Sequence, residues 1–282
     1  MYWLLLIILL CLIVFIVWEN ITVVKTYYKI RIPKMNRKLK GTKIIHLSDL
    51  HFPNERLDLK KLVQNIKDEE PDIIVITGDI IEGELEHNAF NQLRYLGNSL
   101  KMTAPIYAVA GNNDLDYLDG DKWRATLENN NIHVLLDESI WVPLKGYGIV
   151  LMGLKETHEM NDPGVVPDNQ YFMNNIHLKE GMYDQTTILL AHHPEYFERY
   201  LKRHDLEIDL VLSGHTHGGQ IYMPYIGGVY APGQGFNPHY DYGYFASEKE
   251  PDKRLIINGG LSTSNKTIRL FNKMEIGIIE LQ

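Results

Sequence analysis

Short apolar runs rich in β-branched residues alternate with amphipathic helical segments after Gly41, and this alternation constrains the fold most strongly. A buried strand is predicted at residues 43–47. Leu59, Leu62, Val63 and Ile66 then recur at helical spacing until Pro71 ends the helix. Further strands are predicted at residues 72–77 and 106–110, with a helix between them. Strand and helix in repetition indicate an α/β domain whose sheet strands are covered by helices.

The second half of the chain predicts more strands with fewer helices between them. Strand candidates lie at residues 132–136, 149–152, 187–191, 209–212, 254–258, 267–271 and 275–281. Gly227-Gly228, Pro232-Gly233 and Gly235 mark one glycine-rich loop region, which we expect near the functional site.

The N-terminal segment predicts a membrane anchor over residues 1–24. Residues 1–18 are unbroken apolar sequence, which meets the minimum length of a membrane-spanning helix. A cleaved signal peptide is the alternative, but its basic start, shorter apolar run and small-residue cleavage site are missing. A buried helix of a soluble protein is a third alternative, with little for an all-apolar helix to pack against.

Basic residues follow this apolar run and predict its orientation. They are Lys25, Lys29, Arg31, Lys34, Arg37, Lys38, Lys40 and Lys43. The positive-inside rule then predicts a single-pass protein of the cell membrane with the rest of the chain on the cytoplasmic side. Alternatively, these charges line the solvated face of a strand, and both readings can hold together. Residues 25–42 are therefore expected to form a basic linker containing the first strand.

Polar residues stand at the ends of five predicted strands. They are Asp49 and His51, Asp79, Asn112, His192, and the pair His215 and His217. Sites in open α/β sheets form at the carboxyl ends of strands, so we expect these side chains to meet. A mixed set of Asp, Asn and His suits Mn, Fe or Zn better than Ca or Mg.

Each motif alone has a simpler explanation. Asp occurs in turns and helix caps for local hydrogen-bonding reasons, and a Gly followed by Asp or Asn is common where a strand ends. The pair His215 and His217 is harder to explain by packing. All five motifs together, each at a strand end, favour a site of two metal ions.

These motifs resemble those of the calcineurin-like metallophosphoesterases. The matching strings are Asp49-Leu50-His51, Gly78-Asp79, Gly111-Asn112-Asn113-Asp114, His192 and Gly214-His215-Thr216-His217. The longer strings Ser48-Asp49-Leu50-His51 and Gly214–Gln220 look like the membrane-associated bacterial branch, as do Arg269-Leu270-Phe271 and Glu275-Ile276 more weakly. The resemblance implies that residues 43–282 form two packed mixed β-sheets flanked by helices, a four-layer sandwich.

The resemblance also implies which residues hold each ion. One metal would be bound by Asp49, His51, Asp79 and His217. The other would be bound by Asp79, Asn112, His192 and His215, so that Asp79 bridges the pair. Water activated by two divalent ions would then attack phosphorus in line.

One departure from the family concerns the leaving group. Asn113 stands where the family usually has a histidine that works with an aspartate, and Asp114 follows it. Both are expected catalytic residues, but an amide cannot act as a general acid. A good leaving group needs little protonation, which favours pyrophosphates or activated diesters. His193 could substitute, yet neighbouring strand residues face opposite sides, so a structural role is expected for it.

The expected function is hydrolysis of a phosphodiester or pyrophosphate bond, in a lipid-linked or nucleotide-sugar substrate, by a centre of two divalent ions (Mn, Fe or Zn). The alternative is a non-catalytic, membrane-anchored interaction protein that retains the fold. A nuclease, and nucleic acid as a partner, are disfavoured by the net charge of −8. The sequence does not indicate an oligomeric state.

Overall fold

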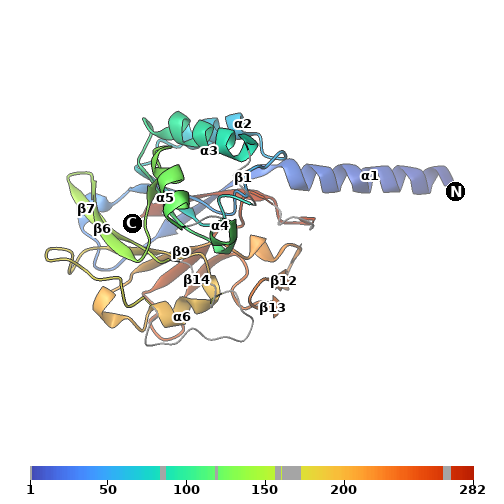
Figure 1. The fold of residues 1–282 in the computed structure, drawn as a ribbon. Helices are drawn as coiled ribbons and strands as arrows, with labels where there is room; N and C mark the ends of the chain where they lie inside the picture. Colours follow the sequence, from blue (N-terminus) through green and yellow to red (C-terminus); the bar gives the residue numbers. More distant parts are fainter. Residues whose placement is uncertain (1, 83–86, 118–119, 156–159, 161–172, 263–267) are drawn as a thin grey trace.

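Two six-stranded mixed β-sheets pack face to face, with helices on their outer faces (Figure 1). The computed structural model describes residues 2–82, 87–117, 120–155, 160, 173–262 and 268–282. This arrangement confirms the predicted α/β fold of two mixed sheets flanked by helices.

The first sheet contains the strands predicted from the first half of the chain. In sheet order its strands are β1 (Val23–Ile30), β16 (Met274–Leu281), β2 (Lys43–Leu47), β3 (Ile73–Thr77), β4 (Ile106–Val109) and β5 (His133–Val134). From β2 to β5 the strands are parallel, β16 is antiparallel to β2, and β1 is parallel to β16.

The second sheet has a parallel centre and two antiparallel edges. In sheet order its strands are β14 (Gly243–Ala246), β15 (Arg254–Ile257), β9 (Leu210–Ser213), β8 (Thr187–Leu190), β7 (Tyr147–Gly153) and β6 (Glu138–Leu144). The strands from β15 to β7 are parallel, and β14 and β6 are the antiparallel edges.

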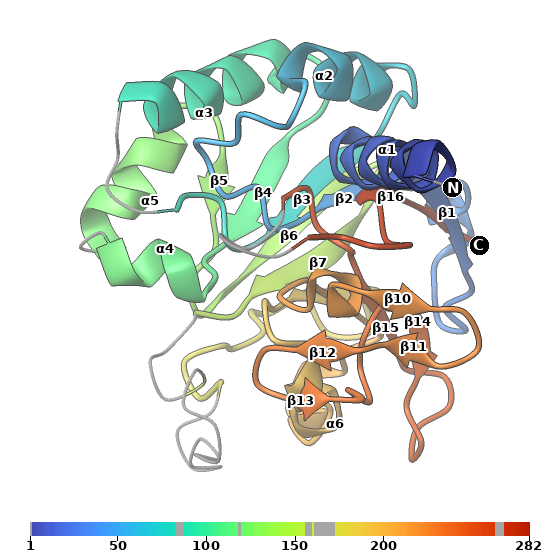
Figure 2. The same ribbon diagram turned by 90° about the vertical axis from the view of Figure 1, so that its right-hand side faces the viewer.

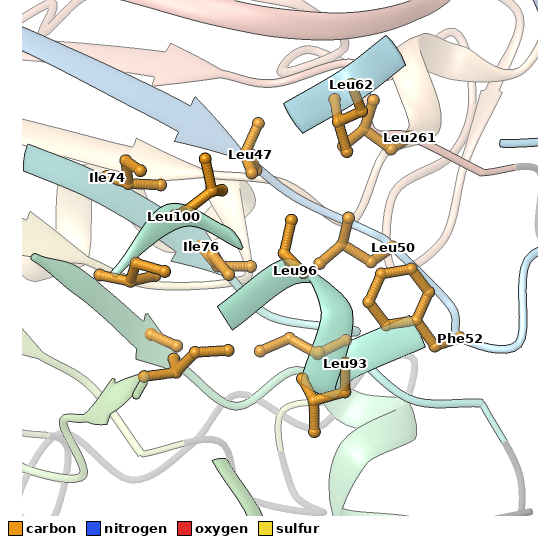
Figure 3. Close-up of a cluster of buried hydrophobic side chains, with 14 of the residues drawn as sticks. Leu47, Leu50, Phe52, Leu62, Ile74, Ile76, Leu93, Leu96, Leu100 and Leu261 are labelled. Atoms are coloured by element: carbon orange, nitrogen blue, oxygen red, sulfur yellow. The ribbon is translucent and has the colours of Figure 1, made fainter. Parts of the chain in front are cut away.

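Alternation along the central strands sorts their apolar side chains into packing layers. In β3, Ile73 and Val75 pack between the sheets, whereas Ile74 and Ile76 pack under the helices. Both faces of these strands are covered, which explains their continuous apolar runs. Figure 3 shows the helix-side layer, where leucines of α3 (His87–Leu100) lie over Ile74 and Ile76.

The helix layer on the first sheet begins with α2 (Leu59–Lys67). A carboxylate oxygen of Asp58 accepts a hydrogen bond from the Lys61 N–H at 3.0 Å, which caps the helix and fixes its start. Beside α3, this layer also contains α4 (Asn112–Tyr117) and α5 (Gly120–Glu128). The second sheet is covered by α6 (Phe197–Tyr200), whose Phe197 and Tyr200 are buried.

Two strand predictions differ from the structure. The strand predicted at residues 132–136 is shorter in the structure, where only His133 and Val134 form β5. The strand predicted at residues 267–271 is wrong for residues 268–271, where Leu270 makes an isolated bridge to Ile221. Arg269 is buried instead, because its guanidinium donates hydrogen bonds to the carbonyls of Ser262 and Gly259. Thr267 lies outside the described residues.

The apolar N-terminal segment forms α1 (Tyr2–Ile21), which projects away from the sheets (Figure 1). Most of its side chains are exposed, whereas Glu19 and Asn20 at its end are buried. Within the described residues, α1 is the helix long and apolar enough to cross a membrane, although a signal sequence passes the same test. The chain then enters the first sheet as β1, starting at Val23.

The carboxyl ends of β2, β3 and β4 lie at the end of the molecule from which α1 leaves. Because β1 is parallel to β16 and β16 is antiparallel to β2, the start of β1 lies level with the loop after β2. Figure 2 views this end, with α1 pointing toward the viewer. The predicted site residues therefore gather at the base of α1.

Candidate metal centre

The loops after β2 and β3 run side by side and bring three of the expected ligands together. The Asp49 N–H donates to the Gly78 carbonyl at 3.0 Å, and the His51 N–H donates to the Asp79 carbonyl at 3.0 Å. Asp49, His51 and Asp79 all have left-handed backbone conformations, with φ of 52°, 46° and 51°. Such turns are costly for non-glycine residues and concentrate at functional sites.

The second sheet contributes the histidines from the ends of β8 and β9. His192 follows β8, and His215 and His217 follow β9. Gly214 lets the two sheets' loops meet, because a Cβ there would stand 1.8 Å from Ser48 Oγ and 2.6 Å from Asp49 Oδ2. A larger residue at position 214 would push the histidines away from the first sheet.

All seven expected metal ligands lie in one cluster. Asp79 Oδ2 is 3.5 Å from both His51 Nε2 and His192 Nε2. Asp49 Oδ1 is 3.5 Å from His217 Nε2. His192 Nε2 is in turn 3.1 Å from both Asn112 Oδ1 and His215 Nδ1. Three sets of ligand atoms, each within 4.8 Å, could hold an ion: Asp49, His51 and His217; Asp49, Asp79 and His192; and His193, Glu195 and His215.

Backbone carbonyls orient two of the histidine rings. His192 Nδ1 lies 2.7 Å from the Thr77 carbonyl, and His217 Nδ1 lies 3.3 Å from the Ser262 carbonyl. A carbonyl accepts hydrogen bonds, so each Nδ1 carries the proton and each Nε2 turns a lone pair toward the cluster. This arrangement is typical of histidines that bind metals.

The protonation states of His215, His217 and Asp79 suit a cation. For His51, burial acts to lower the pKa, but the neighbouring carboxylates of Glu82, Asp79 and Asp49 raise it above its ordinary value. Burial lowers the pKa of His215 well below its ordinary value and the pKa of His217 to about 4, so both rings are neutral near pH 7. Burial acts to raise the pKa of Asp79, but the neighbouring His192, His51 and His215 hold it well below its usual value. Neutral imidazoles and ionised carboxylates are the forms that bind divalent metals.

Three buried atoms of the seven-ligand cluster have no hydrogen-bond partner among the described residues: Asp49 Oδ1 and both ring nitrogens of His51. Of these, Asp49 Oδ1 and His51 Nε2 lie 3.9 Å apart. Native proteins rarely leave buried polar atoms in this state, and a metal ion at this point would satisfy both. The residues present therefore fit a centre of divalent metal ions.

Asn113 and Asp114 lie in the first turn of α4 but face different surroundings. The Asn113 side-chain amide donates to Asp79 Oδ2 at 2.6 Å, at the cluster itself. Asp114 is buried and accepts hydrogen bonds from the Ile80, Ile81 and Gly111 N–H groups and from the Trp123 indole. Burial and the nearby Asp79 carboxylate raise the pKa of Asp114 to about 6.

Sequence reasoning missed the arrangement around His193. The β8 strand ends at Leu190, so strand alternation does not separate His192 from His193. The His193 ring centroid lies 4.0 Å from that of His215, and His193 Nδ1 lies 2.9 Å from Glu195 Oε1. No sequence motif pointed to Glu195, and only its position two residues after His193 could have indicated it.

The sequence model of the family described as calcineurin-like phosphoesterase matches residues 42–219. A Bacillus subtilis protein named uncharacterized metallophosphoesterase YkoQ is 31% identical over 190 residues, covering 66% of this chain and 64% of that protein. A zebrafish (Danio rerio) protein named transmembrane protein with metallophosphoesterase domain is 28% identical over 209 residues, covering 69% and 44%.

The chain covers less than two thirds of the length of the first curated relatives that it matches. Among solved structures, the Thermus thermophilus sulfate thiohydrolase SoxB matches with a TM-score of 0.51 at 11% identity, over 86% of this chain and 56% of that one. At this identity the likeness concerns the fold alone.

Proposed function

This chain belongs to the calcineurin-like phosphoesterase family of metal-dependent hydrolases, and from its site we propose that it hydrolyses a phosphodiester or pyrophosphate bond at a membrane. The observation that carries the proposal is the position of Asp79. Its Oδ2 atom lies 3.5 Å from a histidine of each sheet, where one carboxylate can serve two ions.

We assign one ion to Asp49, His51, Asp79 and His217, and the other to Asp79, Asn112, His192 and His215. Manganese, iron or zinc suits this mixture of ligands. When bound, such ions would lower the pKa of a nearby water molecule and neutralise charge on the phosphoryl oxygens.

Asn113 would hold the substrate rather than donate a proton to the leaving group. Its amide already reaches the cluster, 2.6 Å from Asp79 Oδ2, and can donate a hydrogen bond to a phosphoryl oxygen instead. An amide has no acidic proton for the departing oxygen, so a leaving group that is stable as an anion is favoured. Pyrophosphates and activated diesters, in a lipid-linked or nucleotide-sugar substrate, fit this requirement.

Asp114 would position the loops of the site. Its carboxylate joins the backbone after β3, at Ile80 and Ile81, to the backbone after β4, at Gly111. These segments present Asp79 and Asn112, so Asp114 would act on the metal centre through its geometry.

We further propose that the N-terminal segment anchors the protein in the cell membrane; it was expected over residues 1–24, but its helix ends at Ile21 and Val23 already belongs to β1. The domain that follows would lie on the cytoplasmic side, as in the membrane-associated bacterial branch. The exposed, apolar α1 and the basic residues between Lys25 and Lys43 support this arrangement. The zebrafish relative, which is named a transmembrane protein, also supports it.

Turnover by the purified full chain tests the proposal. With Mn(II) supplied, it should hydrolyse bis(p-nitrophenyl) phosphate, and Asp79→Asn should reduce turnover at least about a hundredfold. Wild-type turnover no greater than that of Asp79→Asn would contradict the proposal. A chain that also stays metal-free when ions are supplied would favour the non-catalytic alternative.

A further inference from the structure

Two hairpins that follow the last site histidine form an uncharged segment. Residues 218–238 contain no Asp, Glu, Lys, Arg or His. They form one hairpin from β10 (Tyr222–Met223) and β11 (Gly227–Gly228), and a second from β12 (Tyr230–Ala231) and β13 (Gly235–Phe236). Such a stretch would ordinarily be buried in a core or turn polar residues to water.

Instead, large apolar side chains of both hairpins are exposed. Tyr225 is fully exposed at the first turn, Ile226 is 64% exposed, and Phe236 is 81% exposed. Tyr230 is 39% exposed and packs edge-on against Phe236, with ring centroids 5.4 Å apart. We call these four side chains the apolar rim. Tyr225 and Ile226 lie on the first hairpin and Tyr230 and Phe236 on the second, and exposed apolar groups of this size mark candidate contact surfaces.

The two hairpins lie at the same end of the molecule as α1, the end that faces the viewer in Figure 2. The connection between them is direct. Ile221 forms a β-bridge with Leu270, and the neighbouring Phe271 packs at a tilt against Phe15 of α1, with 5.6 Å between ring centroids. The apolar surface of α1 thus continues through Phe271 to the hairpins.

Buried hydrogen bonds fix the direction in which α1 leaves the domain. The Asn20 side chain donates to the Arg269 carbonyl at 2.9 Å and accepts from the Arg269 N–H at 3.0 Å. Glu19 Oε2 accepts from the Asn272 N–H at 3.1 Å, and Lys273 Nζ lies 3.6 Å over the Trp18 ring. A helix held this firmly sets the orientation of the domain on the bilayer that it crosses.

The hairpins also lie directly against the metal cluster. A Cβ on Gly233, between β12 and β13, would stand 2.4 Å from Glu195 Oε1 and 3.9 Å from His215 Nε2. A Cβ on Gly219, next to His217, would stand 2.3 Å from Gly228 Cα. The backbone of the hairpins that carry the apolar rim therefore lies beside the metal cluster.

We propose that the apolar rim seats in the interfacial layer of the membrane, so that the metal centre opens toward the bilayer and takes a phosphate ester carried by a lipid. The proposal rests on the proposed hydrolase and its anchor, and it narrows the substrate to the lipid-linked class. Aromatic side chains, Ile226 and the absence of charge suit the headgroup boundary. The lipid chain stays in the bilayer while its phosphate, at headgroup depth, reaches the cluster.

A fluorophore at the tip of the apolar rim tests the contact without using catalysis. The full chain would carry Cys11→Ser, which removes the only cysteine, together with Tyr225→Cys labelled with an environment-sensitive dye. The matched control is Met102→Cys. Met102 is 89% exposed and precedes β4, at the opposite end of the sheet from the site.

In vesicles of phosphatidylcholine and phosphatidylglycerol, the dye at position 225 should shift to the blue and be quenched by spin-labelled lipid. The dye at position 102 should behave as in water. Equal, water-like signals at both positions would overturn the proposal. A blue shift that vanishes as the protein is diluted in lipid would also overturn it, because the apolar rim would then contact a second copy.

Turnover tests the substrate class. Tyr225→Asp with Ile226→Asp should lower hydrolysis of a long-chain alkyl p-nitrophenyl phosphate in vesicles about tenfold. The same variant should leave the soluble bis(p-nitrophenyl) ester unaffected, and Met102→Asp should change neither. If the double variant hydrolysed the long-chain ester as fast as wild type does, or lost the same factor on both esters, a lipid substrate would be contradicted. If wild type hydrolysed neither ester, the proposed function would fail, while the fluorophore result would still decide the membrane contact.

Discussion

Asn113 holds Asp79 by two hydrogen bonds: its side-chain amide donates to Oδ2 at 2.6 Å, and its backbone N–H donates to Oδ1 at 2.9 Å. Asn113, which stands where the family usually has a histidine, is thus hydrogen-bonded to Asp79, the carboxylate that both proposed metal sites share. In the proposed function, this position would put an amide beside the bound phosphate ester, and an amide has no acidic proton to give to the leaving group.

Leaving-group chemistry should therefore govern turnover. We expect wild-type rates across a series of aryl and alkyl diesters to fall steeply as the leaving-group pKa rises. Asn113→His introduces a general acid, and it should raise turnover of the alkyl esters about a hundredfold relative to the p-nitrophenyl ester. A leaving-group dependence that is the same in wild type and Asn113→His would show that this position does not face the departing oxygen.

Asp114→Asn should destabilise the domain. An amide nitrogen in place of either carboxylate oxygen faces backbone N–H donors, so at least one buried donor loses its acceptor. We expect the free energy of unfolding to fall by about 2 kcal/mol, measured by thermal unfolding of the detergent-solubilised chain. A variant Asp114→Asn as stable as wild type would contradict the positioning role.

Gly78→Ala should disrupt the metal centre. Gly78 has φ of +93°, and a Cβ would stand 2.6 Å from His192 Nδ1. The matched control is Gly181→Ala, where φ is +85° and nothing lies within 4 Å of the added Cβ. Both variants should lose about 1–2 kcal/mol of stability from the left-handed backbone. Gly78→Ala alone should also lose bound metal, measured by elemental analysis. Equal metal content in the two variants would contradict the expected role of His192.

Glu69 should contribute stability that depends on pH. Burial acts to raise its pKa, but hydrogen bonds from Lys25 at 2.7 Å and Tyr27 at 2.9 Å hold the pKa below the ordinary 4.5. A carboxylate with a lowered folded-state pKa stabilises above pH 4.5, and this stabilisation is lost as the pH falls through the folded-state value.

Glu69→Gln should therefore lower the free energy of unfolding by up to about 1 kcal/mol at pH 7. Unfolding curves of wild type and variant should converge in acid, and Glu180→Gln, at an exposed position, should match wild type throughout. If the difference in the free energy of unfolding between wild type and Glu69→Gln stayed the same in acid, the ion pair of Glu69 and Lys25 would not be its cause.

The first half of the fold was predictable because its strands are buried on both faces. Ile73–Thr77 and Ile106–Val109 are continuous apolar runs, and such runs carry a strong local signal. The edge strand β6 alternates buried with exposed residues and includes the exposed Trp141, so it lacked that signal. Residues 268–271 mimic a strand in sequence, but burial of Arg269 depends on distant carbonyls that no local pattern reveals.

The metal cluster was predictable from Asp49, Asp79 and the histidines because side-chain ligands have a sequence signature. The groups that orient them do not have one. The carbonyls of Thr77 and Ser262 fix the rings of His192 and His217, and every residue type supplies a carbonyl. The apolar rim was visible only as a glycine-rich segment, because its exposure depends on how the two hairpins pack against the site.

The central claim is that Asp79 joins two metal ions in one site. Its most direct test is the metal content of the purified full chain after Mn(II) is supplied and excess ions are removed. Wild type should retain two ions per chain and Asp79→Asn should retain fewer, whereas Asp58→Asn, which replaces one helix-capping residue by another, should match wild type. Two ions in Asp79→Asn, or fewer than two in wild type, would contradict the account.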